Sequence, residues 1–255
     1  MQLLSERRVG DLVERPFLLG GIPGILWTPG SASPSAPVPV VLAGPPAGPA
    51  GLEVTSSLLR RRAGHAARAG IATAVLEMPG SGARAQPPGV ERARAELRRA
   101  LAAGERVSDD IVDRLVLPLV DQAVPEWQAA LDALLERPEI ADRAGLSGGV
   151  IAVGTRLAAI DPRISAAVLF AGSLVPRSVV EEARRVTAPL HVLLQWDDEG
   201  NDRQRALELF DAFGSAEKTL NANMGGHTGV PAHAGDEAGR FLARHLGAAG
   251  ALPTG

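Results

Sequence analysis

The chain alternates apolar runs of strand length with segments of helical pattern through most of its length. The runs that we predict to be strands are residues 38–43, 71–76, 139–144, 164–170, 190–196 and 217–220, and the predicted helices are 52–69, 150–160, 177–186, 203–213 and 234–246. Strands that are joined by helices pair in parallel, and a parallel sheet is covered by helices on both faces. The sequence therefore predicts an α/β fold with a mostly parallel central sheet. Such sheets carry their sites at the carboxyl ends of the strands.

Two segments depart from this alternation. Residues 17–19 and 22–28 flank Gly20-Gly21, which predicts an antiparallel hairpin at a sheet edge. Residues 87–120 hold charged helical pieces at 91–103 and 109–117, and a further helix at 125–135 follows without an intervening strand. An insertion at this point is typical of a helical lid over a pocket, although an extra surface helix pair explains it equally well. Because no linker divides the chain, we expect residues 1–255 to form one domain.

Composition narrows the functional classes. The 255 residues are 45% hydrophobic with a net charge of -3, which suits one sizeable core, and no basic stripe indicates a nucleic-acid partner. The chain has no cysteine, so thiol chemistry is excluded, and no ligand spacing or phosphate-binding loop predicts a metal or another cofactor. Neither a leader nor a membrane span is evident. We expect a cytoplasmic protein that acts on a small molecule, away from membranes, and that could form a homodimer.

Between a predicted strand and a predicted helix lies Gly145-Leu146-Ser147-Gly148-Gly149, which has the pattern G-x-S-x-G. A serine on a tight strand-to-helix turn takes a strained backbone conformation, and flanking glycines remove side chains that would clash. We expect the Gly148 amide to lie at the helix N-terminus, where it would face a developing negative charge. An ordinary N-cap serine among glycines is the alternative interpretation. A serine nucleophile also needs a base and an orienting acid.

Only five histidines are present to supply that base. His227 lies in a Gly-rich loop directly after the last predicted strand, and His233 is a weaker rival in the same region. His65 and His245 fall within predicted helices, and His191 falls within a predicted strand, where a core histidine with satisfied hydrogen bonds is expected. His227 is therefore the preferred candidate base.

A run of acids, Asp197-Asp198-Glu199, follows the predicted strand that ends near residue 195. One acid would satisfy a turn there, and Asp202 is available to cap the next helix. A G-x-S-x-G elbow is typical of enzymes whose triad follows the chain order serine, carboxylate, histidine, with each residue after a separate strand. The candidates here have that order. The sequence thus predicts a catalytic triad.

These segments resemble the α/β-hydrolase superfamily, and more narrowly its dienelactone-hydrolase-like branch of bacterial serine esterases. The matching segments are residues 22–29, 77–84, 145–149, 193–199 and 217–231, which span nearly the whole chain. The resemblance implies that Ser147 is the nucleophile, Asp198 the orienting acid and His227 the base. Asp198 is preferred to Asp197 because it holds the fourth place after the strand, where relatives have G-x-x-D.

Two turns differ from the pattern of these relatives. A His-Gly-Gly turn, whose amides help to bind the oxyanion, is replaced by Gly44-Pro45-Pro46-Ala47, and proline has no N–H to donate. The remaining oxyanion donors are the amides of Ala47 and Gly148. The relatives' Asp-x-Pro-Gly-His-Gly segment is also changed, to Glu-Met-Pro-Gly-Ser-Gly at residues 77–82.

The sequence accordingly predicts a serine hydrolase that acts on an ester, lactone or thioester through an acyl-enzyme. The changed turns and the inserted helices leave an alternative open, namely a biosynthetic enzyme of natural-product metabolism that performs acyl transfer, cyclisation or carbon–carbon chemistry with water excluded. A non-catalytic binding module is the third possibility, and a full set of serine, acid and histidine argues against it.

Overall fold

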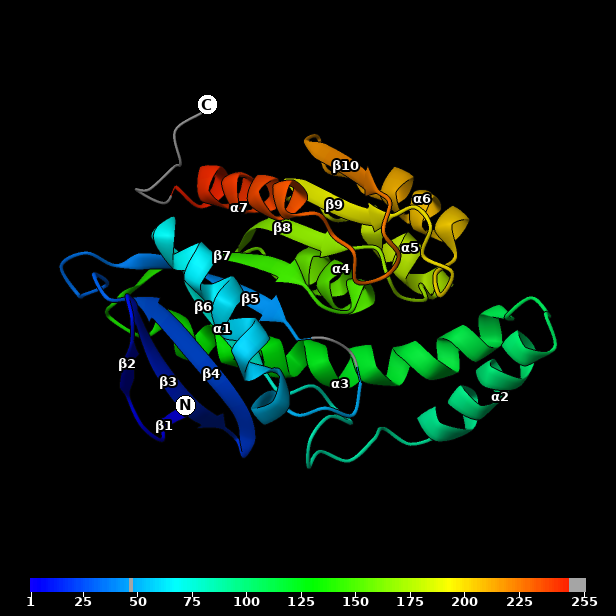
Figure 1. Cartoon of the computed structure of the whole chain (residues 1–255), viewed down its shortest axis with the longest axis horizontal. Helices are drawn as coiled ribbons and strands as arrows, with labels where there is room; N and C mark the ends of the chain where they lie inside the picture. The colour runs from blue at the N-terminus through cyan, green and yellow to red at the C-terminus, as the bar shows by residue number, and fades with distance from the viewer. Residues whose placement is uncertain (46–47, 248–255) are drawn as a thin grey trace.

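The computed structural model describes residues 1–45 and 48–247, and in these residues ten strands form one sheet (Figure 1). Along the sheet the order is β1-β3-β4-β6-β5-β7-β8-β9-β10, with β2 paired to β3. The strands are β1 (Gln2–Leu3), β2 (Arg7–Val9), β3 (Leu12–Leu19), β4 (Ile22–Pro29), β5 (Val38–Gly44), β6 (Ala72–Leu76), β7 (Ile140–Gly148), β8 (Ile164–Phe170), β9 (Leu190–Gln195) and β10 (Lys218–Asn223). Neighbours from β6 to β10 pair in parallel, whereas β1 to β4 pair antiparallel. The predicted mostly parallel sheet is confirmed.

Helices cover both faces of this sheet, as predicted. They are α1 (Leu52–Arg68), α2 (Val90–Ala102), α3 (Asp109–Leu135), α4 (Ile151–Ile160), α5 (Arg177–Ala183), α6 (Arg203–Ala212) and α7 (Ala232–Leu246). Helices α1 and α7 pack on one face, and α3 and α4 pack on the other, where α5 and α6 continue the layer (Figure 1). No helix in the described part of the chain is both long and apolar enough to cross a membrane.

The N-terminal hairpin forms as expected, with Leu19 opposite Ile22 across the tight turn. Strands β1 and β2, which both pair with β3, were not predicted because they are only two and three residues long and mostly exposed. The hairpin joins the parallel strands through β4, which pairs antiparallel with β6.

The prediction of separate helices at 109–117 and 125–135 is wrong. Helix α3 continues without a break through Pro118 and Pro125. A proline inside a helix removes a hydrogen bond and costs about 3 kcal/mol, but α3 buries one long apolar stripe that offsets this cost. The members of the stripe are Val112, Val116, Val120, Ala123, Val124, Trp127, Ala130, Leu131 and Leu134.

Helix α2 packs on α3 rather than on the sheet (Figure 1). At the start of α3, Asp109 forms ion pairs with Arg177, the first residue of α5, and with Arg205 of α6. These contacts attach the inserted helices to the body of the protein. A lid function for residues 87–120 stays a prediction.

A buried carboxylate ties the antiparallel strands to α1. Glu14 of β3 is 1% exposed and accepts hydrogen bonds from Trp27 Nε1 at 2.7 Å, Arg60 Nε at 2.6 Å and Arg7 Nε at 2.8 Å. Burial by itself would raise the pKa of Glu14, but the hydrogen bonds from Arg60, Trp27 and Arg7 outweigh it and hold this pKa below its usual value. The ionised carboxylate therefore stabilises the fold above its ordinary pKa of 4.5 and loses that contribution as the pH falls through the lowered value.

Replacing this carboxylate tests its contribution. We expect Glu14→Gln to lower the free energy of unfolding by about 3 kcal/mol at neutral pH, because two arginines lose a buried partner. The difference from the parent protein should shrink as the pH falls from 4.5 through the lowered pKa of Glu14, because the unfolded chain is protonated first and the folded carboxylate only at the lower pH. Denaturant unfolding at neutral pH and at a pH below 4.5 measures this difference in the free energy of unfolding. Glu6→Gln is the control, because Glu6 is an exposed partner of Arg15. Equal effects of the two substitutions would contradict the assignment.

Candidate active site

The candidate residues gather at the carboxyl ends of β7, β9 and β10, which lie at one edge because these strands run parallel. Ser147 is the last residue but one of β7. Asp198 follows β9, and His227 follows β10. Three segments far apart in the sequence are thus brought to one side of the sheet.

Asp198 and His227 form a hydrogen-bonded pair. His227 Nδ1 lies 2.7 Å from Asp198 Oδ2, and the second carboxylate oxygen accepts the Gly200 amide at 3.0 Å. The Asp198 side chain is 3% exposed and that of His227 is 56% exposed. The edge of the imidazole ring also meets the ring of Phe170, with centroids 5.4 Å apart. A buried acid thus orients an accessible imidazole and leaves Nε2 to take a proton.

The loop that carries His227 is held by the end of β9. The Asp197 carboxylate accepts hydrogen bonds from the amides of Gly225 at 3.0 Å and Gly226 at 2.9 Å, and Gln195 Nε2 donates to the Gly226 carbonyl at 2.8 Å. The amides of Gly226 and Gly225 lower the pKa of Asp197. The sequence did not predict this role of Asp197. The only sign of it was that a second acid stands next to the candidate acid Asp198.

The elbow differs from the prediction at Ser147. Among the described residues only glycines have positive φ, and the left-handed positions at the end of β7 are Gly148, with φ of 66°, and Gly149, with φ of 77°. Ser147 therefore keeps an unstrained backbone, and the turn follows one residue later because glycine adopts this conformation without steric cost. Gly148 belongs to β7, and α4 begins only at Ile151 with Val150 as its N-cap. The expected position of the Gly148 amide at the helix N-terminus is thus wrong.

Close backbone contact explains the flanking glycines. A Cβ at Gly149 would lie 2.7 Å from Cα of Gly44 at the end of β5. A Cβ at Gly145 would lie 3.2 Å from the Ala166 carbonyl oxygen and from the Leu246 side chain, and 3.3 Å from that of Leu242. The elbow and the end of β5 therefore approach to a distance that no side chain permits.

Ser147 lies on the same face of the sheet as the base. It pairs with Val168 of β8, and Phe170, two residues further along that strand, shares its face and supports His227. Ser147 is half-buried, and within the described part of the chain its hydroxyl forms no hydrogen bond. The structure thus joins Asp198 to His227 but does not join Ser147 to them. Catalytic hydrogen bonds often tighten only when substrate binds.

The second predicted oxyanion donor, Ala47, lies outside the described residues. The described residues that follow, Gly48 and Pro49, are hydrogen-bonded to the segment 77–82, which differs from the relatives' pattern. Ser81 Oγ donates to the Gly48 carbonyl at 2.6 Å, and the Gly82 amide donates to the Pro49 carbonyl at 2.9 Å.

Glu77, at the start of the same segment, has a role that the sequence did not reveal. Its buried carboxylate accepts the Leu52 amide at 3.0 Å and so caps α1, whose own N-cap, Gly51, has no side chain to do so. A lone acid after an apolar strand was the available signal.

The remaining histidines lie elsewhere. His65 is on the surface of α1, and His233 is an exposed residue in the first turn of α7. His191 is buried in β9 with Nδ1 2.7 Å from Thr219 Oγ1, and burial lowers its pKa. Its Nε2 has no hydrogen-bond partner among the described residues. The prediction of a core histidine with satisfied hydrogen bonds therefore holds for only one of its two ring nitrogens. Nowhere in residues 1–45 and 48–247 do three potential metal ligands cluster.

No protein-family model and no curated protein sequence matches the chain. Several solved structures, however, are similar to it. A cold-adapted esterase from an Arctic intertidal metagenomic library is 27% identical, with a TM-score of 0.73 over 96% of this chain and 100% of that one. Acetyl xylan esterase 1 from Thermoanaerobacterium is 15% identical, with a TM-score of 0.60 over 95% and 87% of the chains. A putative dienelactone hydrolase from Klebsiella pneumoniae is 16% identical, with a TM-score of 0.60 over 97% and 99%.

The chain therefore has the α/β-hydrolase fold in its dienelactone-hydrolase-like form, as the sequence predicted. Its similarity to the cold-adapted esterase, together with this fold, supports an enzyme like the carboxylic ester hydrolases. The last two comparisons, at lower identity, bear on the fold alone.

The close approach at the elbow makes a steric prediction. Gly149→Ala should destabilise the protein by about 1–3 kcal/mol, because the substitution adds both a backbone strain and a contact with Gly44. Gly145→Ala is the matched control and should cost less, because Gly145 has no positive φ and its nearest backbone contact, the Ala166 carbonyl oxygen, is 3.2 Å away rather than 2.7 Å. Thermal or denaturant unfolding of both variants measures the difference, and an equal cost for both would contradict the described elbow.

The contacts of Asp197 predict a pH-dependent restraint on the base loop. Asp197→Ala should speed hydrogen exchange at the Gly225 and Gly226 amides, whereas Asp197→Asn, whose amide oxygen can still accept, should have a smaller effect. Because the pKa of Asp197 is lowered, the parent protein should keep this restraint at pH 3.8 and lose it on further acidification. Amide exchange by NMR tests this, and unchanged exchange in Asp197→Ala would remove the proposed role.

Proposed function

We propose that this protein is a serine hydrolase that cleaves a small ester, lactone or thioester through an acyl-enzyme, with Ser147, His227 and Asp198 as its catalytic triad. The observation that carries the proposal is the 2.7 Å hydrogen bond between buried Asp198 and accessible His227. The pair stands at the same edge of the sheet as the G-x-S-x-G elbow. The similarity of the whole chain to a cold-adapted esterase supports ester hydrolysis in particular.

In the proposed reaction Ser147 Oγ attacks the substrate carbonyl carbon, and His227 Nε2 takes the hydroxyl proton. The carbonyl oxygen becomes an oxyanion that the Gly148 amide, with that of Ala47, is proposed to bind. Collapse expels the alcohol or thiol, which receives the proton from His227. Water then attacks the acyl-enzyme with His227 again as the base, which releases the acid and restores Ser147.

Asp198 acts in this scheme through His227. Its hydrogen bond to Nδ1 fixes the ring so that Nε2 is the basic nitrogen, and its negative charge stabilises the imidazolium that forms. Burial of the carboxylate strengthens both effects, because water does not screen the charge. No observation on the described residues favours acyl transfer, cyclisation or carbon–carbon chemistry over hydrolysis.

The test combines a covalent probe with turnover. The parent protein should be labelled by a fluorophosphonate and should hydrolyse a p-nitrophenyl ester, and Ser147→Ala should abolish both. Asp198→Asn should lower kcat by about 10³- to 10⁴-fold while the fold is retained, because the imidazole loses its correct tautomer.

His233→Ala provides the matched control, since His233 is exposed and forms no part of the proposed triad. It should keep the parent rate. Turnover by Ser147→Ala at the parent rate would rule out the proposed nucleophile. Labelling of the parent without release of product would instead favour transfer to an acceptor other than water.

A further inference from the structure

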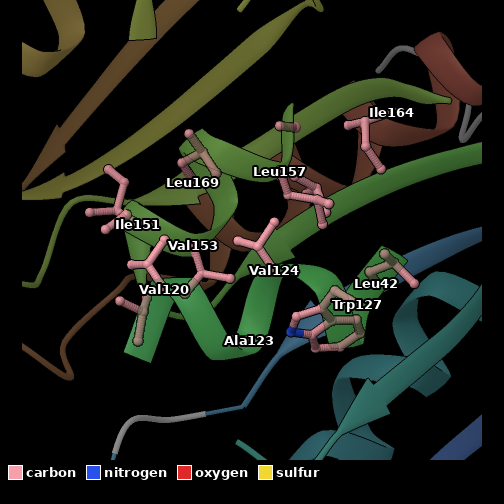
Figure 2. Close-up of a cluster of buried hydrophobic side chains, with 14 of the residues drawn as sticks. Leu42, Val120, Ala123, Val124, Trp127, Ile151, Val153, Leu157, Ile164 and Leu169 are labelled. Atoms are coloured by element: carbon pink, nitrogen blue, oxygen red, sulfur yellow. The ribbon is translucent and has the colours of Figure 1, made fainter. Parts of the chain in front are cut away.

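The two faces of the sheet offer different groups to the proposed triad. On the face that α3 and α4 cover, apolar side chains such as Leu42 and Trp127 form one core (Figure 2), with a cavity of about 20 Å³ beside the elbow. Leu146 belongs to this core, and Ser147 faces the other way because successive side chains of a strand alternate. Side chains on the face that α7 covers therefore share the side of Ser147.

Gln195 is a polar side chain on that face. It is the last residue of β9 and comes two residues after Leu193, which packs with α7, so the two side chains point the same way. Gln195 is 1% exposed, and its Nε2 donates to the Gly226 carbonyl at 2.8 Å. In the G-x-x-D pattern that ends here at Asp198, this place belongs to the glycine. The chain thus has a buried amide where that pattern has no side chain.

The Gly226 carbonyl belongs to the turn that carries the proposed base. It also accepts the Gly229 amide at 3.2 Å, which closes a β-turn over residues 226–229 with His227 as its second residue. Gly225 and Gly226 lead into the turn with φ of 125° and 65°. Glycine has the greatest backbone freedom of all residues. The position of His227 therefore depends on what holds these two glycines.

Both peptide groups of Gly226 are held from the end of β9. Asp197 accepts the Gly226 amide at 2.9 Å, and Gln195 donates to the carbonyl. Because one bond acts on the peptide group before Gly226 and the other on the peptide group after it, together they restrain its φ and ψ. The next residue is His227, whose ring is oriented by Asp198. The backbone and the ring of the proposed base are thus both fixed relative to β9.

We propose that Gln195 is a positioning residue of the triad, whose amide holds the turn so that His227 Nε2 meets Ser147. The inference rests on the proposed function and adds a residue to it. Although Gln195 Oε1 is buried, it has no hydrogen-bond partner among the described residues. A buried oxygen without a partner costs stability, so an apolar side chain of similar size would suit the folded state better. The donor nitrogen, rather than stability, accounts for glutamine at this place.

Gln195→Met tests this role, because methionine has a similar length and volume but cannot donate a hydrogen bond. With a p-nitrophenyl ester, kcat should fall about 10- to 100-fold, since a small misplacement of a catalytic group has an effect of this size. KM should change by less than about threefold, because substrate binding is not altered. Hydrogen exchange at the Gly229 amide should become at least about tenfold faster. The unfolding temperature should not fall, since the Gly226 carbonyl keeps its bond from Gly229.

Gln128→Met is the matched control. Gln128 is a partly buried residue of α3, on the opposite face of the sheet, and its Nε2 donates to Asp161 Oδ2 at 3.4 Å. The substitution removes one amide hydrogen bond away from the base loop and should leave kcat unchanged. Gln195→Leu takes the place of Gln195→Met if that variant does not fold.

The outcomes separate this inference from the proposed function. A kcat equal to that of the parent in the folded Gln195 variant would overturn the positioning role while the proposed function stands. A lower kcat that is accompanied by a lower unfolding temperature and by unchanged exchange at Gly229 would give Gln195 a structural role alone, and would also overturn it. Failure of the parent to hydrolyse any ester would remove the proposed function together with this inference.

Discussion

The backbone contact between Gly44 and Gly149 is the constraint on which the arrangement of the site depends. Strand β5 and the turn after β7 approach so closely that a Cβ on either glycine would overlap the other's Cα. This contact sets where β7 must turn towards α4. A small apolar cavity, whose wall includes both glycines, lies beside this contact. The place where the chain turns after Ser147 is thus a consequence of one steric requirement.

The end of β9 performs two tasks with neighbouring acids. Asp198 is turned inward, where burial suits a carboxylate that orients an imidazole. Asp197, one residue earlier, is exposed and accepts hydrogen bonds from the glycine amides that precede His227. Both residues lie in the turn that follows β9, where one carboxylate is buried and the other stays exposed. The base is thereby fixed through both its ring and its backbone.

Local pattern predicted most elements because hydrophobic periodicity reflects which face is buried. It failed where burial overrode local propensity. Pro118 and Pro125 indicated helix ends, yet the apolar stripe of α3 carries the helix through both. It failed also at the elbow, where Ser147 was expected to be strained. Glycine at the next two positions gave the chain a less costly place to turn, and the sequence pattern did not distinguish these possibilities.

The sequence by itself determined the alternation of strands and helices, the resemblance to α/β-hydrolases and the candidates Ser147, Asp198 and His227, because each depends on residue type and order. Only the tertiary structure decided which acid meets His227, what Asp197 and Glu77 bind, and that a small apolar cavity adjoins the elbow. These features depend on distances between segments far apart in the chain. Such distances are set by how the sheet and its helices pack, and no local pattern records them.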